Sequence, residues 1–415
     1  MTSLLPSRRW NGSSGGVGRG VKNDVGYESL ASRRRRDDRD HCATLVRKRD
    51  YEGYLCGLLL PSAASRESYF AIRALNVEVA GIKDASGSVA GRTRGVVGGR
   101  NGIAAGGGAI LPSRFAGDDN TPFDDRDGNN MGGGGSSMAQ RLRMQWWKDA
   151  ISQIYSNAAT TSVAGDDDPS SSARRNPTLR SVAHAIRTHQ LTHRFIRRLI
   201  EARELDLDMT QYTTMSNVAQ YGEDTMSNIL YLTFECVNVR DEKADLIASD
   251  IGVGLGILTS LRSTGFRILQ NECSIPVDVA TRYGITMDML HTALSAVEKE
   301  QDDSTTSTNT VIDADRVVLS QEALRNAVIE MAELATFHLH RAREHQSNVP
   351  KEGRMALLPA VCGLHYLNSL KECNYNVLHP SLLGGNNDPS LERVERKRRL
   401  NLMFLLGRTW LTGTF

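Results

Sequence analysis

Apolar residues recur at intervals of three and four positions through most of the chain after residue 137. This spacing places them on one face of an α-helix, where they form a stripe that a neighbouring helix can cover. The clearest stripes are Leu179, Val182, Ala183 and Ile186, then Phe195, Ile196, Leu199 and Ile200, and later Leu324, Ala327, Val328, Met331 and Leu334. We find no persuasive alternation of apolar and polar residues of the kind that predicts a β-strand. The pattern predicts an all-α fold.

The segment from Cys42 to Lys83 has the same helical spacing, and Pro61 predicts a break between two helices there. Residues 85–137 are dominated by Gly, Asp, Asn and Ser, with too few large apolar residues to offset the entropy lost on ordering. We therefore interpret residues 42–415 as one helical domain that is interrupted by a disordered insertion at 85–137. Shorter polar breaks are expected at 166–177 and 301–310.

The first 41 residues are basic and serine-containing, and no acidic residue precedes Asp24. Two interpretations are open: an organelle transit peptide, which is typically basic and poor in acids, or an ordinary disordered basic tail. We favour the transit peptide, because the acidic residues Asp37, Asp38 and Asp40 appear only near the end of this stretch.

The bulk composition excludes several classes of function. The formal net charge is only +2 and no basic stripe is interleaved with aromatic residues, so nucleic acid is not an expected partner. The six cysteines are scattered singly, which fits a reduced compartment and argues against a disulfide framework or a zinc site. No apolar run approaches the roughly 18–20 residues of a transmembrane helix, so a membrane would be met from one side.

A basic segment near the end of the chain, Arg393 to Arg399, precedes the apolar and aromatic residues from Leu400 to Leu411. Such a segment can lie on an anionic membrane, with its cations at the headgroups and its apolar side chains below them. It can equally be a last core helix whose first turns are basic and solvated. The sequence leaves both interpretations open.

Several motifs resemble the squalene/phytoene synthase family, in the family's order, from about Cys42 to Trp410 apart from the Gly-rich insertion. They are residues 47–54 (RKRDYEGY), 69–80 (YFAIRALNVEVA), 141–150 (RLRMQWWKDA), 201–207 (EARELDL), 221–232, 250–262 and 357–361 (LLPAV), together with Leu261, Arg262 and Pro276, which frame the second motif. The resemblance implies an isoprenoid synthase-like helical bundle. Enzymes of this family hold two allylic diphosphates through magnesium ions bound to Asp-rich helices.

The metal-binding carboxylates of that family are missing here. Aligned on Arg73, the first aspartate-rich motif falls on Asn76, Val77 and Ala80, and the second motif falls on Ser263, Phe266 and Arg267. The resemblance therefore implies no catalytic residue, no bound metal and no cofactor. Since Arg267 carries a positive charge where a magnesium ligand would stand, it should repel the cation. Arg73, Arg262 and Arg267 could still contact an anion or a lipid phosphate without metal.

The remaining polar clusters have structural interpretations. Glu78 is expected to be a hydrogen-bonded or solvated carboxylate, and Glu201, Glu204, Asp206 and Asp208 to form an ion-paired helix face. His338, His340 and His345 lack the i, i+4 spacing of a helical zinc site, and Gly252, Gly254 and Gly256 predict close helix packing.

The degenerate motifs resemble a non-catalytic branch of the family that assists the assembly of respiratory complex I (NADH dehydrogenase). The resemblance implies a mitochondrial protein, peripheral on the matrix side of the inner membrane, whose partners are complex I subunits or other assembly factors. The first alternative is an active squalene or phytoene synthase, which is a prenyltransferase. The second alternative is a protein that binds a lipid or isoprenoid without metal.

Overall fold

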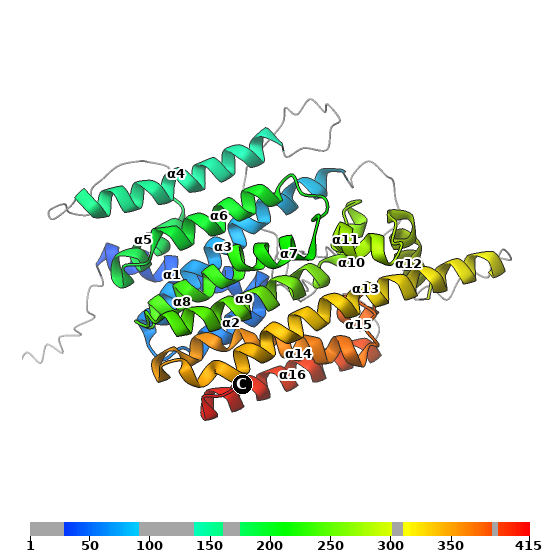
Figure 1. Ribbon diagram of the computed structural model, residues 1–415. Helices are drawn as coiled ribbons and strands as arrows, with labels where there is room; N and C mark the ends of the chain where they lie inside the picture. The colour runs from blue at the N-terminus through cyan, green and yellow to red at the C-terminus, as the bar shows by residue number, and fades with distance from the viewer. Residues whose placement is uncertain (1–28, 91–136, 161–174, 301–309, 384–388) are drawn as a thin grey trace, which may run out of the picture.

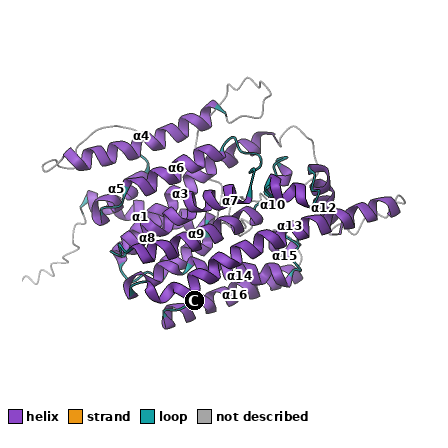
Figure 2. Ribbon diagram, in the orientation of Figure 1, coloured by secondary structure: helices purple, strands orange, loops and turns teal. Residues whose placement is uncertain are grey.

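The structure is a computed structural model that describes residues 29–90, 137–160, 175–300, 310–383 and 389–415 of the chain. These residues form helices and loops and contain no β-strand (Figure 2), so the all-α prediction is confirmed. Most of the insertion expected at 85–137, and most of the polar breaks expected at 166–177 and 301–310, lie outside the described residues.

The first three helices are α1 (Leu30–Arg49), α2 (Tyr51–Leu58) and α3 (Ala63–Ala90). The expected break at Pro61 is confirmed, and a further break occurs at Asp50, whose carboxylate accepts a hydrogen bond from the Gly53 amide at 3.0 Å and caps α2. Helix α1 begins at Leu30, before the domain boundary expected at residue 42, and α3 continues to Ala90, past residue 85.

Contacts with distant helices explain why α1 is ordered despite its polar sequence. Asp38 forms an ion pair with Arg180 of a later helix, and Arg35 donates to Glu67 of α3 at 3.0 Å. Cys42 and Val46 are fully buried on the same helix face. These partners are remote in the sequence, so the composition of residues 30–41 does not reveal them.

Eight helical segments follow in the middle of the chain: α4 (Met138–Thr160), α5 (Pro177–His189), α6 (His193–Asp206), α7 (Met215–Gly222), the π-helix η2 (Glu223–Ser227), α8 (Asn228–Cys236), α9 (Glu242–Arg262) and α10 (Thr264–Leu269). The last part of the chain contains α11 (Val277–Arg282), α12 (Met287–Glu300), α13 (Thr310–His345), the 3-10 helices η3 (Gln346–Asn348) and η4 (Lys351–Leu357), α14 (Pro359–Glu372), α15 (Pro380–Leu383) and α16 (Pro389–Thr412). Figure 1 shows α4 and α16 at opposite edges of the bundle, with α9 between them.

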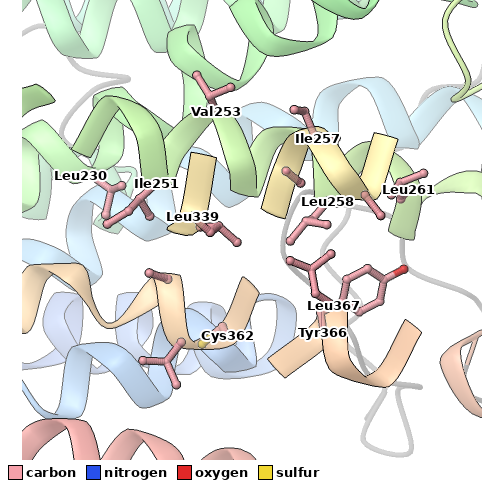
Figure 3. Close-up of a cluster of buried hydrophobic side chains, with 14 of the residues drawn as sticks. Leu230, Ile251, Val253, Ile257, Leu258, Leu261, Leu339, Cys362, Tyr366 and Leu367 are labelled. Carbon is pink, nitrogen blue, oxygen red and sulfur yellow. The ribbon is translucent and has the colours of Figure 1, made fainter. Parts of the chain in front are cut away.

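The core is built around α9, which packs against α7, η2, α13 and α14. Figure 3 shows its side chains Ile251, Ile257, Leu258 and Leu261 beside Leu339 of α13 and Cys362 of α14. The predicted stripes are buried at nearly every position, including Leu179, Ile196 and Met331, although Ala183, Phe195 and Leu334 remain partly accessible.

Glycines let helices approach α9 closely, as predicted. A Cβ atom on Gly256 would overlap the Cα atom of Gly222, and a Cβ on Gly252 would overlap the backbone of Ser227. A side chain at either position would therefore push α9 away from the end of α7 and from η2.

Among the described helices, α9 is long and apolar enough to cross a membrane, contrary to the expectation that no segment reaches this length. Two thirds of its most apolar window, 67%, is buried inside the bundle. Its apolar surface is thus already covered by other helices, and we assign it to the protein core.

Candidate functional site

The residues of the first degenerate motif lie on α3, facing α6. Asn76 is buried, and its side-chain oxygen accepts a hydrogen bond from Arg203 of α6 at 3.0 Å. Arg203 also donates to the hydroxyl of Tyr221 at 2.6 Å and lies over its ring. An arginine, which repels cations, thus lies within hydrogen-bond distance of the first motif. The other two motif residues, Val77 and Ala80, supply no polar atom from their side chains.

Two buried donors of this pair have no hydrogen-bond partner among the described residues: Nδ2 of Asn76 and Nε of Arg203. Both are N–H groups, which suit an anion or a carbonyl oxygen and oppose a metal ion.

The second degenerate motif does not lie on one helix. Helix α9 ends at Arg262, and the short helix α10 begins at Thr264. Ser263 lies between the two helices as the cap residue of both. Ser263 donates to the Ser260 carbonyl at 2.8 Å, and Thr264 donates to the Leu261 carbonyl at 2.8 Å. These local bonds compete with the helical ladder and explain the interruption. Phe266, in the next turn, is half-buried.

Arg267 meets two carboxylates at the end of α10. Its Nη1 donates to Glu272 at 2.9 Å, and its Nη2 lies 3.6 Å from Asp206 of α6. Lys83 of α3 lies 3.5 Å from Asp206 and 3.4 Å from Glu272, and it donates to two backbone carbonyls. We call these four side chains, Lys83, Asp206, Arg267 and Glu272, the ion cluster. Its two cations and two anions join α3, α6 and α10.

Burial perturbs the ionisation of this region. Burial by itself would lower the pKa of Arg267, but Asp206 and Glu272 hold that pKa above its usual range. Burial lowers the pKa of Lys83, and the nearby Arg267 lowers it further. Asp84 lies beside the cluster, and burial raises the pKa of its carboxyl to about 6, although Arg203 and Arg267 oppose the shift.

Two tyrosines close the same region. Tyr212 donates to Asp206 at 2.8 Å, and its ring packs against that of Tyr221 with centroids 5.5 Å apart. Burial raises the pKa of both hydroxyls well above the ordinary value, and Asp206 adds to the shift. Both tyrosines are therefore neutral at physiological pH: the Tyr212 hydroxyl donates to Asp206, and the Tyr221 hydroxyl accepts from Arg203. In this region the two cations of the ion cluster balance its two anions, and the raised pKa of each tyrosine keeps its hydroxyl from acting as an activated nucleophile.

The arginines proposed as anion contacts all lie in ion pairs. Arg73 approaches Asp50 at 2.7 Å, while Arg262 donates to Glu52 at 2.9 Å and stacks on the ring of Tyr366 at 4.2 Å. Both pairs join α2 to other helices, whereas Arg267 belongs to the ion cluster. An anion would have to compete with a carboxylate at each of the three.

Sequence reasoning missed the partners of these arginines. Asp50 and Glu52 stand in a motif that carries the family resemblance, but nothing in their spacing assigns them to Arg73 and Arg262. Lys83, Asp84 and Glu272 gave no signal at all, because each acquires its role from helices that are remote in the sequence.

The other candidate residues are structural. Glu78 accepts hydrogen bonds from Asn176 and Thr178 at the start of α5. In the acidic cluster, Glu204 pairs with Lys148 at 2.8 Å and Asp208 with Arg141 at 2.8 Å, so the expected ion-paired face is confirmed with partners mainly from α4. Glu201 pairs with Arg197 at 3.5 Å.

His338 hydrogen-bonds Asp250 of α9 at 2.9 Å, beside an ion pair of Arg341 with the same carboxylate. This histidine therefore links α13 to α9. Within the described ranges, no three His, Cys, Asp or Glu side chains are grouped closely enough to hold a metal ion.

A surface groove of about 240 Å³ lies between α4 and α6, away from the two degenerate motifs. Its lining mixes both signs of charge, with Lys148, Asp149, Arg197 and Glu201. Such a lining shows no preference for one class of ligand.

Two solved structures share this fold. A squalene synthase, HpnC, from Alicyclobacillus acidocaldarius superposes with a TM-score of 0.52 and 15% sequence identity, covering 82% of this chain and 96% of that one. A dehydrosqualene synthase in complex with a ligand superposes with a TM-score of 0.56 and 13% identity, covering 92% and 99%. At this identity the likeness shows the fold alone, and it confirms the expected isoprenoid synthase-like bundle.

Among curated sequences, the chain is 30% identical to NADH dehydrogenase (ubiquinone) complex I, assembly factor 6 from Bos taurus over 346 residues, which are 82% of this chain and 76% of the relative. It is 29% identical to the Homo sapiens protein of that name over 83% of this chain and 77% of the relative. The homologue from Drosophila melanogaster is 27% identical over 83% and 78%.

The sequence model of the squalene/phytoene synthase family matches residues 46–389, which are most of the chain. This match spans both degenerate motifs, the helices that carry the ion cluster and the central helix α9. On these grounds, the chain belongs to the squalene/phytoene synthase family.

Proposed function

We propose that this protein is a non-catalytic mitochondrial assembly factor for respiratory complex I. The relatives that match most of its length are named complex I assembly factors, which supports the role. The observation that carries the non-catalytic part is the ion cluster: where a synthase of this fold needs acidic helices open to magnesium, Arg267 and Lys83 neutralise Asp206 and Glu272.

A magnesium ion would need several unpaired carboxylate oxygens in octahedral geometry. Here the cluster is already held by two cations, and Arg203 places a third positive charge beside Asn76. Bringing in a divalent cation would require these pairs to break and their cations to leave a buried site. Prenyl transfer through bound magnesium is accordingly disfavoured, and the fold serves as a binding body.

The protein is further proposed to act on the matrix side of the inner membrane and to bind complex I subunits or other assembly factors there. The basic, acid-poor N-terminus supports import into mitochondria. We also propose a lipid phosphate as a ligand, since Asn76 and Arg203 have buried donors without a partner in the described structure.

The test is deletion of the gene with measurement of assembled complex I on native gels and of cellular isoprenoid products. We expect cells without the gene to lose assembled complex I while their sterols and carotenoids stay unchanged. Expression of the full chain should restore complex I in these cells. Normal complex I with lost isoprenoids would instead establish a synthase.

A matched variant sharpens this test. Glu78→Gln removes the acid that remains within the first motif, while its amide oxygen can still accept from Asn176 and its amide nitrogen can donate to the Thr178 hydroxyl. We expect it to restore complex I as well as the wild type does. Purified wild-type protein should form no product from farnesyl diphosphate with magnesium, and a magnesium-dependent product that Glu78→Gln abolishes would overturn the proposal.

A further inference from the structure

The outer face of α16 carries a continuous row of exposed apolar side chains. Leu400, Met403, Phe404, Trp410 and Leu411 retain 62%, 43%, 69%, 50% and 78% of their accessible surface. Their spacing of three and four residues places them on one helix face. Single exposed apolar residues are common, but a contiguous row of five large ones indicates a surface that another body covers.

The opposite face of α16 is packed into the bundle. Leu402, Leu406 and Thr409 are buried, and the helix contacts α14 and α15. Arg398 donates to the Ser381 carbonyl at 2.9 Å. After the helix ends, the Phe415 amide donates to Gln346 at 2.9 Å, and the Phe415 carbonyl accepts from Arg343 at 2.8 Å.

The apolar row is therefore presented by a helix whose orientation is already determined. Figure 1 shows α16 at the edge of the bundle, so its outer face meets no other described helix. The sequence left two interpretations of this segment open, a last core helix and a membrane-surface helix. The inner face of α16 fits the first, because it is packed in the core. The outer face fits the second, because it is apolar and exposed.

The charge around this row is positive. From Arg396 to Phe415 the sequence contains no acidic residue and five basic ones: Arg396, Lys397, Arg398, Arg399 and Arg408. The two acids just before them, Glu392 and Glu395, pair with Arg396 and Arg399. By helical periodicity, Lys397 and Arg408 border the apolar row on one side, and the Arg399–Glu395 ion pair borders it on the other.

We propose that the outer face of α16 docks on the surface of an anionic lipid bilayer. An apolar row bordered by cations, here Lys397 and Arg408, is the pattern of helices that lie in the membrane interface, with aromatic and leucine side chains below the headgroups. The exposed face is a single convex helix rather than a groove, which suits a fluid surface better than a preformed protein pocket. This inference deepens the proposed peripheral membrane position by naming the contact surface and the lipid chemistry.

Vesicle flotation with the purified full chain tests this. Vesicles of equal parts phosphatidylcholine and phosphatidylglycerol should bind the protein, pure phosphatidylcholine vesicles should bind it weakly, and added salt should weaken binding to the anionic vesicles. The double variant Phe404→Glu with Leu411→Glu should lose at least about tenfold in affinity, because both side chains would carry charge into the apolar layer.

A charge variant and a matched control separate the contributions. Lys397→Gln with Arg408→Gln should weaken binding about 25-fold, at about fivefold for each cation near the surface. Leu246→Glu with Leu319→Glu changes two equally exposed leucines on α9 and α13 and should leave binding unchanged. All variants should keep the helical circular dichroism of the wild type, since every changed side chain is exposed.

The inference is overturned if the wild type fails to bind anionic vesicles, or if the control loses as much affinity as the α16 variants. A third refuting result is that Phe404→Glu with Leu411→Glu blocks complex I assembly while vesicle binding persists, which would assign the face to a protein. Restoration of complex I in deleted cells by a chain that never binds vesicles would refute this inference and leave the proposed function standing. Vesicle binding without restoration would do the reverse.

Discussion

Removal of Arg267 from the ion cluster should destabilise the fold. In Arg267→Met the aliphatic stem keeps its packing, while Glu272 loses a charge-assisted hydrogen bond of 2.9 Å and Asp206 loses a cation at 3.6 Å. The three side chains retain only 14%, 16% and 7% of their accessible surface, so water can replace little of the lost interaction.

Breaking a buried ion pair by removing one partner costs about 3–5 kcal/mol. Lys83 remains 3.4 Å from Glu272 and 3.5 Å from Asp206 and continues to neutralise part of their charge. We therefore expect a somewhat smaller loss, about 2–4 kcal/mol. For a chain of this size, the corresponding fall in Tm is about 2–5 °C.

Thermal unfolding followed by circular dichroism at neutral pH measures this change. The double variant with Glu272→Gln should be less destabilised than the sum of the two single variants, because the two residues interact. Arg282→Met is the matched control, since Arg282 pairs with Glu330 at the surface and its loss should leave Tm nearly unchanged. If Arg267→Met shifts Tm no more than Arg282→Met, the ion cluster does not hold α3, α6 and α10 together.

Two further predictions concern packing and pH. Gly256→Val should lower the stability by about 2–4 kcal/mol, because its side chain would displace Gly222. Gly81→Ala is the control: no atom lies within 4 Å of the added Cβ, so this change should raise the stability by about 0.5–1 kcal/mol. Equal effects of the two changes on Tm would contradict the close approach at α9. The Asp84 carboxyl, with its pKa raised to about 6, stabilises the fold fully below its unfolded pKa of about 4, and about 2–3 kcal/mol is lost as pH rises through 6. Asp84→Asn should abolish that loss and should be more stable than the wild type at pH 7.5. If Asp84→Asn leaves the dependence of Tm on pH between 4 and 7 unchanged, Asp84 is not the group responsible. Asp149→Asn, at an exposed carboxylate, is the control.

Much of the architecture was predictable from the sequence, because helices depend on local spacing. The stripe at Leu179–Ile186 follows from apolar residues three and four positions apart. The break at Pro61 follows from a single residue that interrupts a helix. The glycines of α9 also predicted close helix packing, since a glycine within a long apolar helix usually allows another helix to approach closely. The family resemblance alone aligned Asn76 and Ser263 with positions where synthases carry metal-binding carboxylates.

The boundaries of order were less predictable. The composition of residues 30–41 is typical of a tail, yet these residues form part of α1. Their order comes from Arg180 and Glu67, which lie on α5 and α3 and stabilise charges that would otherwise stay in water. No local window of sequence contains that information.

The state of the degenerate site was decided by tertiary structure. The family resemblance aligns Arg267 with a metal-ligand position and so predicts a free positive charge with a preference for anions. Only the folded chain brings Glu272, Asp206 and Lys83 around it, and this compensation converts the charge into a structural tie between helices. The physical reason is range: helical periodicity acts over one or two turns, whereas a buried charge is determined by whichever opposite charges the packed helices place within a few ångströms.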